Sequence, residues 1–142
     1  MKKHLLLSFI LLAVSYASFA QQIVGAGKSE FLLIMRFKAD FRPSSDEAVK
    51  TNIKKWQAYE SDLTKSGNLV YGYRPASDGL TISGTEKSLK TSPYIAEGEL
   101  ISSIWVIKAE SMDAAKAIAD RCPIFEFGGS VEVRPVIETA SK

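Results

Sequence analysis

The chain has 142 residues, of which 46% are hydrophobic and 24% are charged, and its formal net charge at pH 7 is +2. A chain of this size and composition fits one globular domain with a single hydrophobic core. The near balance of charge and the lack of a basic block give no reason to expect a nucleic-acid partner, since such proteins neutralise many phosphates with lysine and arginine.

The N-terminus has the three-part layout of a secretory signal peptide. A short positive segment, Met1–His4, precedes the apolar run Leu5–Val14, and small residues lie just before Gln21. The apolar run is too short to cross a membrane as a helix, which needs about 20 residues, and it lacks the periodicity of a buried helix. We therefore expect a signal peptide over residues 1–20, a flexible lead over residues 21–30, and an exported protein, periplasmic or secreted, with no membrane contact once the signal is removed.

Cleavage before Gln21 would also change the chemistry available to the chain. It removes two lysines, so that the 16 acidic side chains are matched by as many basic ones, and it removes His4, the only histidine. Histidine is the usual general base near neutral pH and the commonest transition-metal ligand, and the single cysteine, Cys122, can form no internal disulfide. We therefore expect no metal site and no cofactor, and the composition disfavours serine-triad hydrolysis and histidine-bound zinc or haem.

The first two elements after the lead are a strand and a helix. Residues 31–37 (FLLIMRF) predict a strand with apolar side chains on both faces. Phe31, Leu33, Met35 and Phe37 share one face, and Leu32, Ile34 and Arg36 share the other. The helix that follows has a capping box formed by Ser44 and Glu47 and ends at Gly67. Its apolar stripe comprises Val49, Ile53, Trp56, Leu63 and either Tyr59 or Glu60.

The second half of the chain contains further strands and a second helix. We expect strands at 69–74 and 80–83 around a turn at 75–79, a polar loop at 84–93, and strands at 100–108 and 131–136. A second helix begins at Ser111 and ends at Pro123. Its apolar stripe comprises Met112, Ala115, Ile118 or Ala119, and Cys122.

This order of elements, βαββαβ, predicts an α+β, ferredoxin-like fold with an antiparallel sheet. The helices of such a fold cover one face of the sheet only. The apolar residues on the other face then need a partner, so we expect a homodimer in which two sheets pack together.

Four segments resemble the YCII-related (DGPF-type) domain family. They are FLLIMRF, the helix around Trp56–Tyr59 with SGNLVYG, ELISSIWVIKAESMDAA, and RCPIFEFGGSVEVRPV. The resemblance covers residues 31–138 and implies a dimeric α/β barrel, in which two sheets enclose a pocket and which some monooxygenases and isomerases share. The chain departs from the family pattern at Thr91–Tyr94, where the acidic residue of the family's Asp-Gly-Pro-Phe/Tyr is lost. The histidine–aspartate pair of some members is also absent from the expected mature chain.

Seven polar or amphipathic residues on or beside the predicted sheet are candidates for a ligand pocket. They are Arg36, Tyr59, Tyr71, Tyr94, Glu99, Glu126 and Arg134. An arginine can grip a carboxylate or phosphate with two parallel hydrogen bonds, a glutamate in an apolar pocket can move protons, and a tyrosine can orient a flat ligand. The alternative is structural: Arg36 and Arg134 would pair with Glu126, Glu132 or Glu99 and hold the strand register.

Two further features of the chain are interpreted as structural. Cys122 lies on an apolar stripe near a helix C-terminus, where the helix dipole disfavours a thiolate. Gly128 and Gly129 precede a strand rather than a helix, so a turn that needs positive φ explains them better than a phosphate site.

These residues leave two functions open. The first is an exported binding or accessory domain that holds a small, partly apolar ligand between the sheets of a homodimer. The second is a cofactor-independent enzyme of the dimeric-barrel type, monooxygenase- or isomerase-like, in which a carboxylate or tyrosine acts with an arginine. The sequence assigns no catalytic residue. The enzyme needs a carboxylate shielded from water beside a pocket, so the surroundings of Glu99 and Glu126 separate the two hypotheses.

Overall fold

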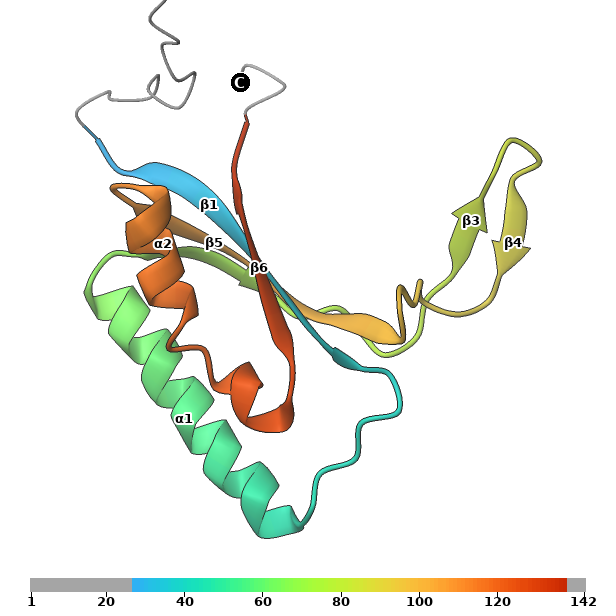
Figure 1. Ribbon diagram of the computed structural model, residues 1–142, viewed down its shortest axis with the longest axis horizontal. Helices are drawn as coiled ribbons and strands as arrows, with labels where there is room; N and C mark the ends of the chain where they lie inside the picture. Colours follow the sequence, from blue (N-terminus) through green and yellow to red (C-terminus); the bar gives the residue numbers. More distant parts are fainter. Residues whose placement is uncertain (1–26, 138–142) are drawn as a thin grey trace, which may run out of the picture.

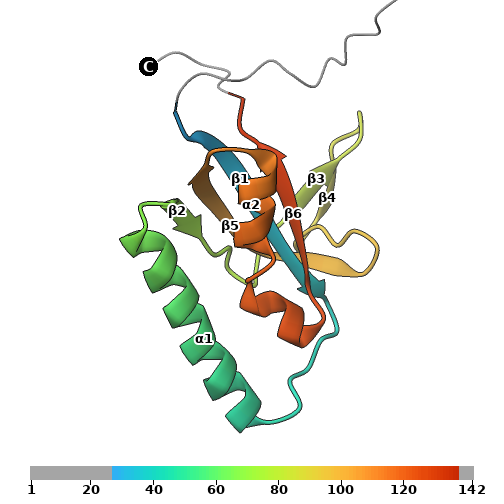
Figure 2. The ribbon, with the colours of Figure 1, turned by 60° about the vertical axis from the view of Figure 1, so that its left-hand side comes forward.

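An antiparallel sheet of four strands forms the centre of the molecule, and two helices lie on one of its faces (Figures 1 and 2). The computed structural model describes residues 27–137, so the expected signal peptide and most of the expected lead lie outside the described residues. In chain order the elements of this unit are β1 (Ser29–Lys38), α1 (Asp46–Lys65), β2 (Leu69–Tyr73), β5 (Glu99–Ala109), α2 (Met112–Ala119) and β6 (Ser130–Pro135). The strand order β2-β5-β1-β6 is that of a ferredoxin-like fold, and the α+β class expected from the sequence is confirmed.

Helix α1 begins one residue later than the sequence predicts. Ser45, not Ser44, is the N-cap, and its hydroxyl oxygen accepts a hydrogen bond of 3.1 Å from the amide of Ala48. The predicted capping box is therefore wrong, because the third residue after the cap is an alanine, which has no side chain that could bond back. At the other end the chain leaves the helix through Gly67, whose φ of +67° fits the predicted stop.

The buried side of α1 differs from the predicted stripe at one turn. Asn52, Tyr59 and Leu63 are buried, whereas Ile53 is 50% exposed. Asn52 takes the inner position because its side-chain amide donates a hydrogen bond of 3.1 Å to the carbonyl oxygen of Pro123, and a polar group can be buried when it is paired in this way. The predicted stripe is thus right at Tyr59 and Leu63 and wrong at Ile53.

Helix α2 is shorter than the sequence predicts. Ser111 caps it as expected, since its hydroxyl oxygen accepts a bond of 3.1 Å from the amide of Ala114, but the helix ends at Ala119 rather than at Pro123. A short 3₁₀ helix, η1 (Pro123–Phe127), follows, and Gly128 ends it with a φ of +69°. The positive φ expected at this turn is therefore confirmed at Gly128.

The core lies between the helices and the sheet face that they cover. Phe31, Leu33 and Met35, alternate residues of β1, are buried in it, as are Trp105 and Ile107 of β5. The helices and η1 contribute Tyr59, Leu63, Ala115, Ile118, Ala119 and Ile124. The predicted alternation of β1 is confirmed, and this face of the sheet is closed by the chain itself.

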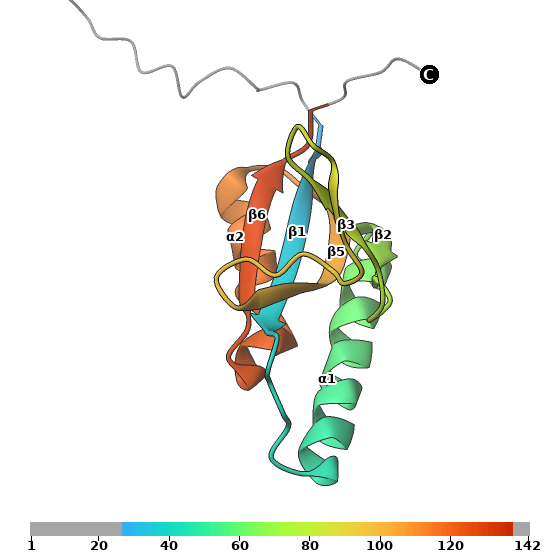
Figure 3. The ribbon, with the colours of Figure 1, turned by 90° about the vertical axis from the view of Figure 1, so that its right-hand side faces the viewer.

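A second, two-stranded sheet stands apart from the first. Among the described residues, β3 (Thr81–Ser83) and β4 (Ser88–Lys90) pair only with each other. They project from the side of the main sheet that faces away from the helices (Figures 1 and 3). We call residues 79–95, which contain this hairpin, the arm. The strands expected at 69–74 and 80–83 are present as β2 and β3, but they do not pair with each other: β2 pairs with β5, and β3 pairs with β4. The loop expected at 84–93 is wrong in part, because the chain turns after Ser83 and returns as β4.

Candidate functional site

The sheet face opposite the helices carries four of the candidate residues, and we call it the open face. Its apolar members on the two central strands include Leu32 and Ile34 of β1, which pair with Val106 and Ile104 of β5. Residues paired across antiparallel strands share a face of the sheet. All four side chains are partly exposed, and no helix of the described chain lies over them (Figure 3). The open face is therefore an apolar surface on which a ligand or another protein can pack.

Two tyrosines extend the open face onto the edge strand β2. Tyr71 pairs with Val106 and Tyr73 with Ile104, so both rings lie on the same face as the apolar residues of β5. Their ring centroids are 6.2 Å apart with an interplanar angle of 25°, and the residues are 59% and 60% exposed. Flat aromatic surfaces of this kind can pack against a planar ligand, while their hydroxyl groups stay available for hydrogen bonds.

Opposite the tyrosines, the open face carries a cluster of two arginines and one glutamate. Arg36 of β1 forms an ion pair of 2.9 Å with Glu132 of β6, and the Nε of Arg134 donates to the other carboxylate oxygen of Glu132. These hydrogen bonds, that from Arg134 first and that from Arg36 second, lower the pKa of Glu132. Two guanidinium groups thus share one carboxylate, and the cluster keeps a net positive charge that could attract an anion.

Glu99 lies at the end of the same face and is already paired. It forms an ion pair of 3.3 Å with Lys38 and accepts a hydrogen bond of 3.1 Å from the hydroxyl of Ser130. The bond from Lys38, followed by that from Ser130, lowers the pKa of Glu99. A carboxylate held ionised in this way is a poor proton carrier at neutral pH.

The other three candidates lie away from the open face. Tyr59 is buried on the helix side, stacks on Trp105 with ring centroids 5.6 Å apart, and donates a hydrogen bond of 2.9 Å to the carbonyl oxygen of Ile118. Burial raises its pKa above the usual value. Tyr94 follows the hairpin in the arm and is 70% exposed. The structure therefore does not bring Tyr59 and Tyr94 together with the arginines.

Glu126 also lies on the helix side, in η1. It binds Lys55 at 2.6 Å and accepts a bond of 3.4 Å from Asn52, and the bond from Lys55 is the main reason why its pKa is lowered. The structural pairing predicted for Arg36 and Arg134 is thus made by Glu132, while Glu126 and Glu99 pair with lysines.

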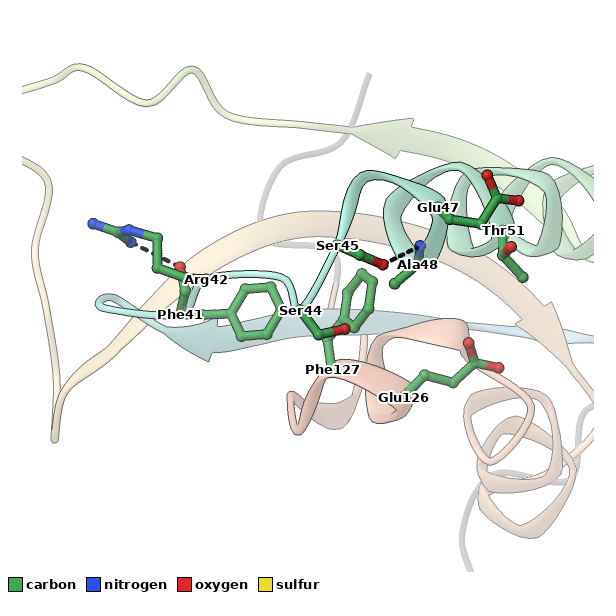
Figure 4. A pocket seen from close by; sticks show the side chains of 9 residues that line it. All are labelled: Phe41, Arg42, Ser44, Ser45, Glu47, Ala48, Thr51, Glu126 and Phe127. Carbon is green, nitrogen blue, oxygen red and sulfur yellow. Dashed lines mark hydrogen bonds between the residues drawn. The ribbon is translucent and has the colours of Figure 1, made fainter.

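A hollow of about 600 Å³ lies beside Glu126 at the start of α1 (Figure 4). Three of its polar side chains already have partners within the protein: the Ser45 hydroxyl accepts the capping bond, Arg42 donates a bond of 2.7 Å to the carbonyl oxygen of Phe41, and Glu126 is paired with Lys55. Figure 4 shows Arg42 directed away from Glu47 and Glu126. The hollow therefore lacks a converging set of groups, and the open face is the better candidate site.

Cys122 has the environment expected of a structural thiol. It is 3% exposed, and burial raises its pKa to about 11. A nucleophilic cysteine needs a lowered pKa and access to solvent. The interpretation of Cys122 as a buried structural residue is confirmed.

Several members of the open face were not among the candidates, and they include Tyr73, Ile104 and Glu132. The alternation Tyr71–Gly72–Tyr73 is a signal for two tyrosines on one face of a strand. The position of Glu132 between two arginines depends on the pairing of β6 with β1, and strand register is not visible in the sequence.

Among residues 27–137, no group of three or more His, Cys, Asp or Glu side chains is placed to hold a metal ion.

A ferredoxin-like domain with an apolar, arginine-bearing open sheet face defines the class of this protein. The sequence model of the YCII-related domain family matches residues 30–140, and the chain belongs to that family, as the four sequence segments indicate. A comparison with curated proteins gives no match. In the part of the chain that the structure describes, no helix has the length and apolar character needed to span a membrane.

Proposed function

We propose that this YCII-related protein is an exported binding protein that holds a small, partly apolar ligand on the open face, enclosed by the same face of a second copy. The observation that carries the proposal is the open face itself. It combines uncovered apolar side chains, exposed tyrosines and a positively charged arginine cluster on one surface. Uncovered apolar patches rimmed by polar residues are typical of binding surfaces.

The residues of the open face also suggest what the ligand carries. Ile34, Ile104 and the two tyrosines suit an apolar or planar part. Arg134 is the more accessible arginine, with 64% of its side chain exposed against 24% for Arg36. Its guanidinium group suits a carboxylate or phosphate, which it can bind with two parallel hydrogen bonds.

A second copy is the simplest cover for this surface. A two-fold axis places the same patch of both chains face to face, so that one set of residues satisfies both sides of the contact. Two sheets packed face to face lie about 10 Å apart, and the arginines and tyrosines at their rims leave a space lined by both chains. This arrangement is the dimeric α/β barrel that the family resemblance implies.

The three glutamates with shifted pKa values favour binding over the enzymatic alternative. The pKa values of Glu99, Glu126 and Glu132 are all lowered by hydrogen bonds from cationic side chains or a hydroxyl. A general acid or base that works near neutral pH needs the opposite shift. Glu99 and Glu126 therefore lack the shielded, proton-exchanging surroundings that the enzyme hypothesis requires.

Native mass spectrometry of the protein purified from its own host tests the ligand proposal. We expect a co-purifying small molecule that is released on denaturation and is lost in Arg134→Gln, because a charge-assisted hydrogen bond contributes roughly 10-fold or more in affinity. Arg121→Gln is the matched control, since Arg121 pairs with Asp62 on the helix side. Equal retention of the ligand by both variants would place its site elsewhere.

Two further measurements test the dimer and the export. Light scattering at micromolar concentration should give twice the mass of one chain, and a monomer would contradict the enclosed site. Mass spectrometry of the exported protein should give a chain that begins at Gln21, whereas an intact Met1 would contradict cleavage.

A further inference from the structure

The arm has one polar and one apolar face, although it lies outside the core. Ile82 and Leu89 are direct cross-strand partners, so their side chains share one face of the hairpin, and Leu80 lies two residues before Ile82 on the same side. The opposite face is polar and comprises Thr81, Ser83, Ser88 and Lys90. Such an alternation is typical of a strand pair that packs its apolar face on another surface.

The apolar face of the arm is uncovered in a single chain. Leu80, Ile82 and Leu89 are 60%, 61% and 63% exposed. An isolated two-stranded hairpin is only marginally stable in water, and exposed apolar strands favour association with other chains. The arm therefore needs a surface on which Leu80, Ile82 and Leu89 can be buried.

We propose that the arm packs against a second copy of this chain, so that each subunit of the dimer holds the other with its arm. The inference rests on the proposed dimer. The arm and the open face lie on the same side of the molecule (Figures 1 and 3), so one partner can cover both surfaces at once. The exchange of two identical arms about a two-fold axis also leaves no apolar arm unmatched.

The area that a stable dimer needs supports this assignment. Four strands about 4.8 Å apart, each contributing about six residues at about 3.3 Å per residue, cover a flat area of about 400 Å². A specific, stable interface buries about 800 Å² on each partner. The open face supplies roughly half of this interface area, before the uneven surface of its side chains is counted. The arm offers further apolar surface. The arm would also close one side of the proposed ligand space with Ile82 and Leu89.

Paired variants of the two arm faces test the inference by analytical ultracentrifugation of the protein expressed with its complete sequence. Ile82→Lys with Leu89→Glu alters the apolar face, and Ser83→Lys with Ser88→Glu alters the polar face. Both double variants place an opposite-charge pair directly across the strands, so the hairpin is retained and the net charge is unchanged. We expect the first to raise the dimer dissociation constant roughly 100-fold, because two buried aliphatic side chains are lost from the interface, and the second to leave it within about threefold.

The outcomes of this experiment separate the arm from the dimer. A wild-type protein that is monomeric at about 100 µM overturns both the proposed dimer and the exchanged arm. A wild-type dimer that both double variants retain equally overturns the arm alone and leaves the contact between the sheets standing.

A second measurement locates the arm directly. A nitroxide is attached to Glu86→Cys, in the turn between β3 and β4, and the labelled protein is mixed with ¹⁵N-labelled wild-type protein; Cys122 is buried and does not compete for the label. We expect broadening of amide signals from the open-face strands of the ¹⁵N chain. If the signals of the ¹⁵N chain stayed sharp in a mixture shown by native mass spectrometry to contain mixed dimers, the arm would not lie on the second copy and the exchange would be overturned.

Discussion

The two faces of the main sheet are built from alternate residues of the same strands, yet they differ in burial and charge. On the helix-covered face, Leu33 and Met35 are completely buried, and the chain's own helices provide the cover. On the open face, Leu32 and Ile34 remain partly exposed, beside an arginine–glutamate–arginine cluster. Neighbouring residues of β1 therefore lie on opposite faces, one in the closed core and the next on the uncovered surface.

This difference separates residues that hold the fold from residues available for binding. The closed face has no charged group among its buried side chains within the described chain, as expected for a core that forms without a partner. The open face combines apolar side chains with ion pairs. Such ion pairs are tolerated at an exposed surface, and a covering partner or ligand would enclose them. Substitutions on the closed face should therefore lower the unfolding free energy at every protein concentration. The effect of substitutions on the open face should depend on the concentration.

The largest expected effect comes from Leu33→Ala on the closed face. Leu33 has no exposed surface, and removing a fully buried leucine side chain leaves a cavity that costs about 2–5 kcal/mol of unfolding free energy. Urea unfolding followed by circular dichroism measures this loss.

The matched control is Leu32→Ala, one residue earlier on the open face. The loss of unfolding free energy in Leu32→Ala should be smaller at low protein concentration. It should grow as the concentration rises, because a contact that forms only in the dimer stabilises the fold more when more of the protein is dimeric. If the two variants lost the same free energy at every concentration, the distinction between the two faces would not hold.

Gly129→Ala tests the close packing of the backbone between the end of η1 and the start of β6. A Cβ at this position would lie 2.5 Å from the carbonyl oxygen of Arg36 and 2.6 Å from a side-chain carbon of Ile124. The backbone oxygen cannot move aside without disturbing β1, so we expect a loss of about 3 kcal/mol in the unfolding free energy.

Gly128→Ala is the comparison for this variant. Gly128 has a φ of +69°, but a Cβ added there would meet no atom within 4 Å. Only the backbone conformation is then strained, and the cost should be about 1 kcal/mol. A larger loss for Gly128→Ala than for Gly129→Ala would mean that the close approach to Arg36 is absent.

Asn52→Ala tests the polar contact between α1 and η1 on the closed side. It removes the amide that donates to the carbonyl oxygen of Pro123 and leaves that buried oxygen without this donor, which should cost about 2 kcal/mol. Ile53→Ala, at the neighbouring and half-exposed position, should change the unfolding free energy by only about 0.5 kcal/mol. A larger loss of unfolding free energy for Ile53→Ala than for Asn52→Ala would mean that Ile53 lies in the core, as the sequence predicts.

The sequence predicts the order of the main elements because each carries a local signal. A run of large apolar residues marks β1, Ser111 marks the start of α2, and Gly67 follows the end of α1. Asn52 is different, since its burial depends on a carbonyl 71 residues away. Strand β4 is not predicted because Leu89 is its only apolar residue, so that the segment 88–90 has the composition of a polar loop.

The candidate site was predicted in part for the same reason. Residue type and alternation are enough to place Arg36, Tyr71 and Arg134 on strands, and these three residues do share the open face. Whether Glu132 or Glu126 meets the arginines depends on strand pairing and on the path of η1, and neither leaves a local signal. Tyr59 has the residue type of a ligand contact, but its hydrogen bond to Ile118 belongs to the core.

The smallest expected effect comes from Glu132→Gln, measured as a function of pH. The pKa of Glu132 is lowered in the folded protein by hydrogen bonds from Arg134 and Arg36, so its ionised form stabilises the fold at pH values above its unfolded pKa of about 4.3. That contribution is lost as the pH falls through the lower, folded value. Glu132→Gln should therefore have a lower urea midpoint than wild type at pH 7, and the difference should shrink toward zero as the pH falls below about 4.

Glu126→Gln gives the same sign of pH dependence from the closed side, because hydrogen bonds from Lys55 and Asn52 also lower the pKa of Glu126. The two variants should differ in their response to protein concentration. Glutamine at position 132 leaves two guanidinium groups facing each other on the surface that the second copy would cover, so its effect at pH 7 should increase as the dimer forms. The effect of Glu126→Gln should be the same at every concentration, because η1 lies on the side of the sheet that the helices cover. If the two variants showed equal concentration dependence, the open face would not be the surface that associates.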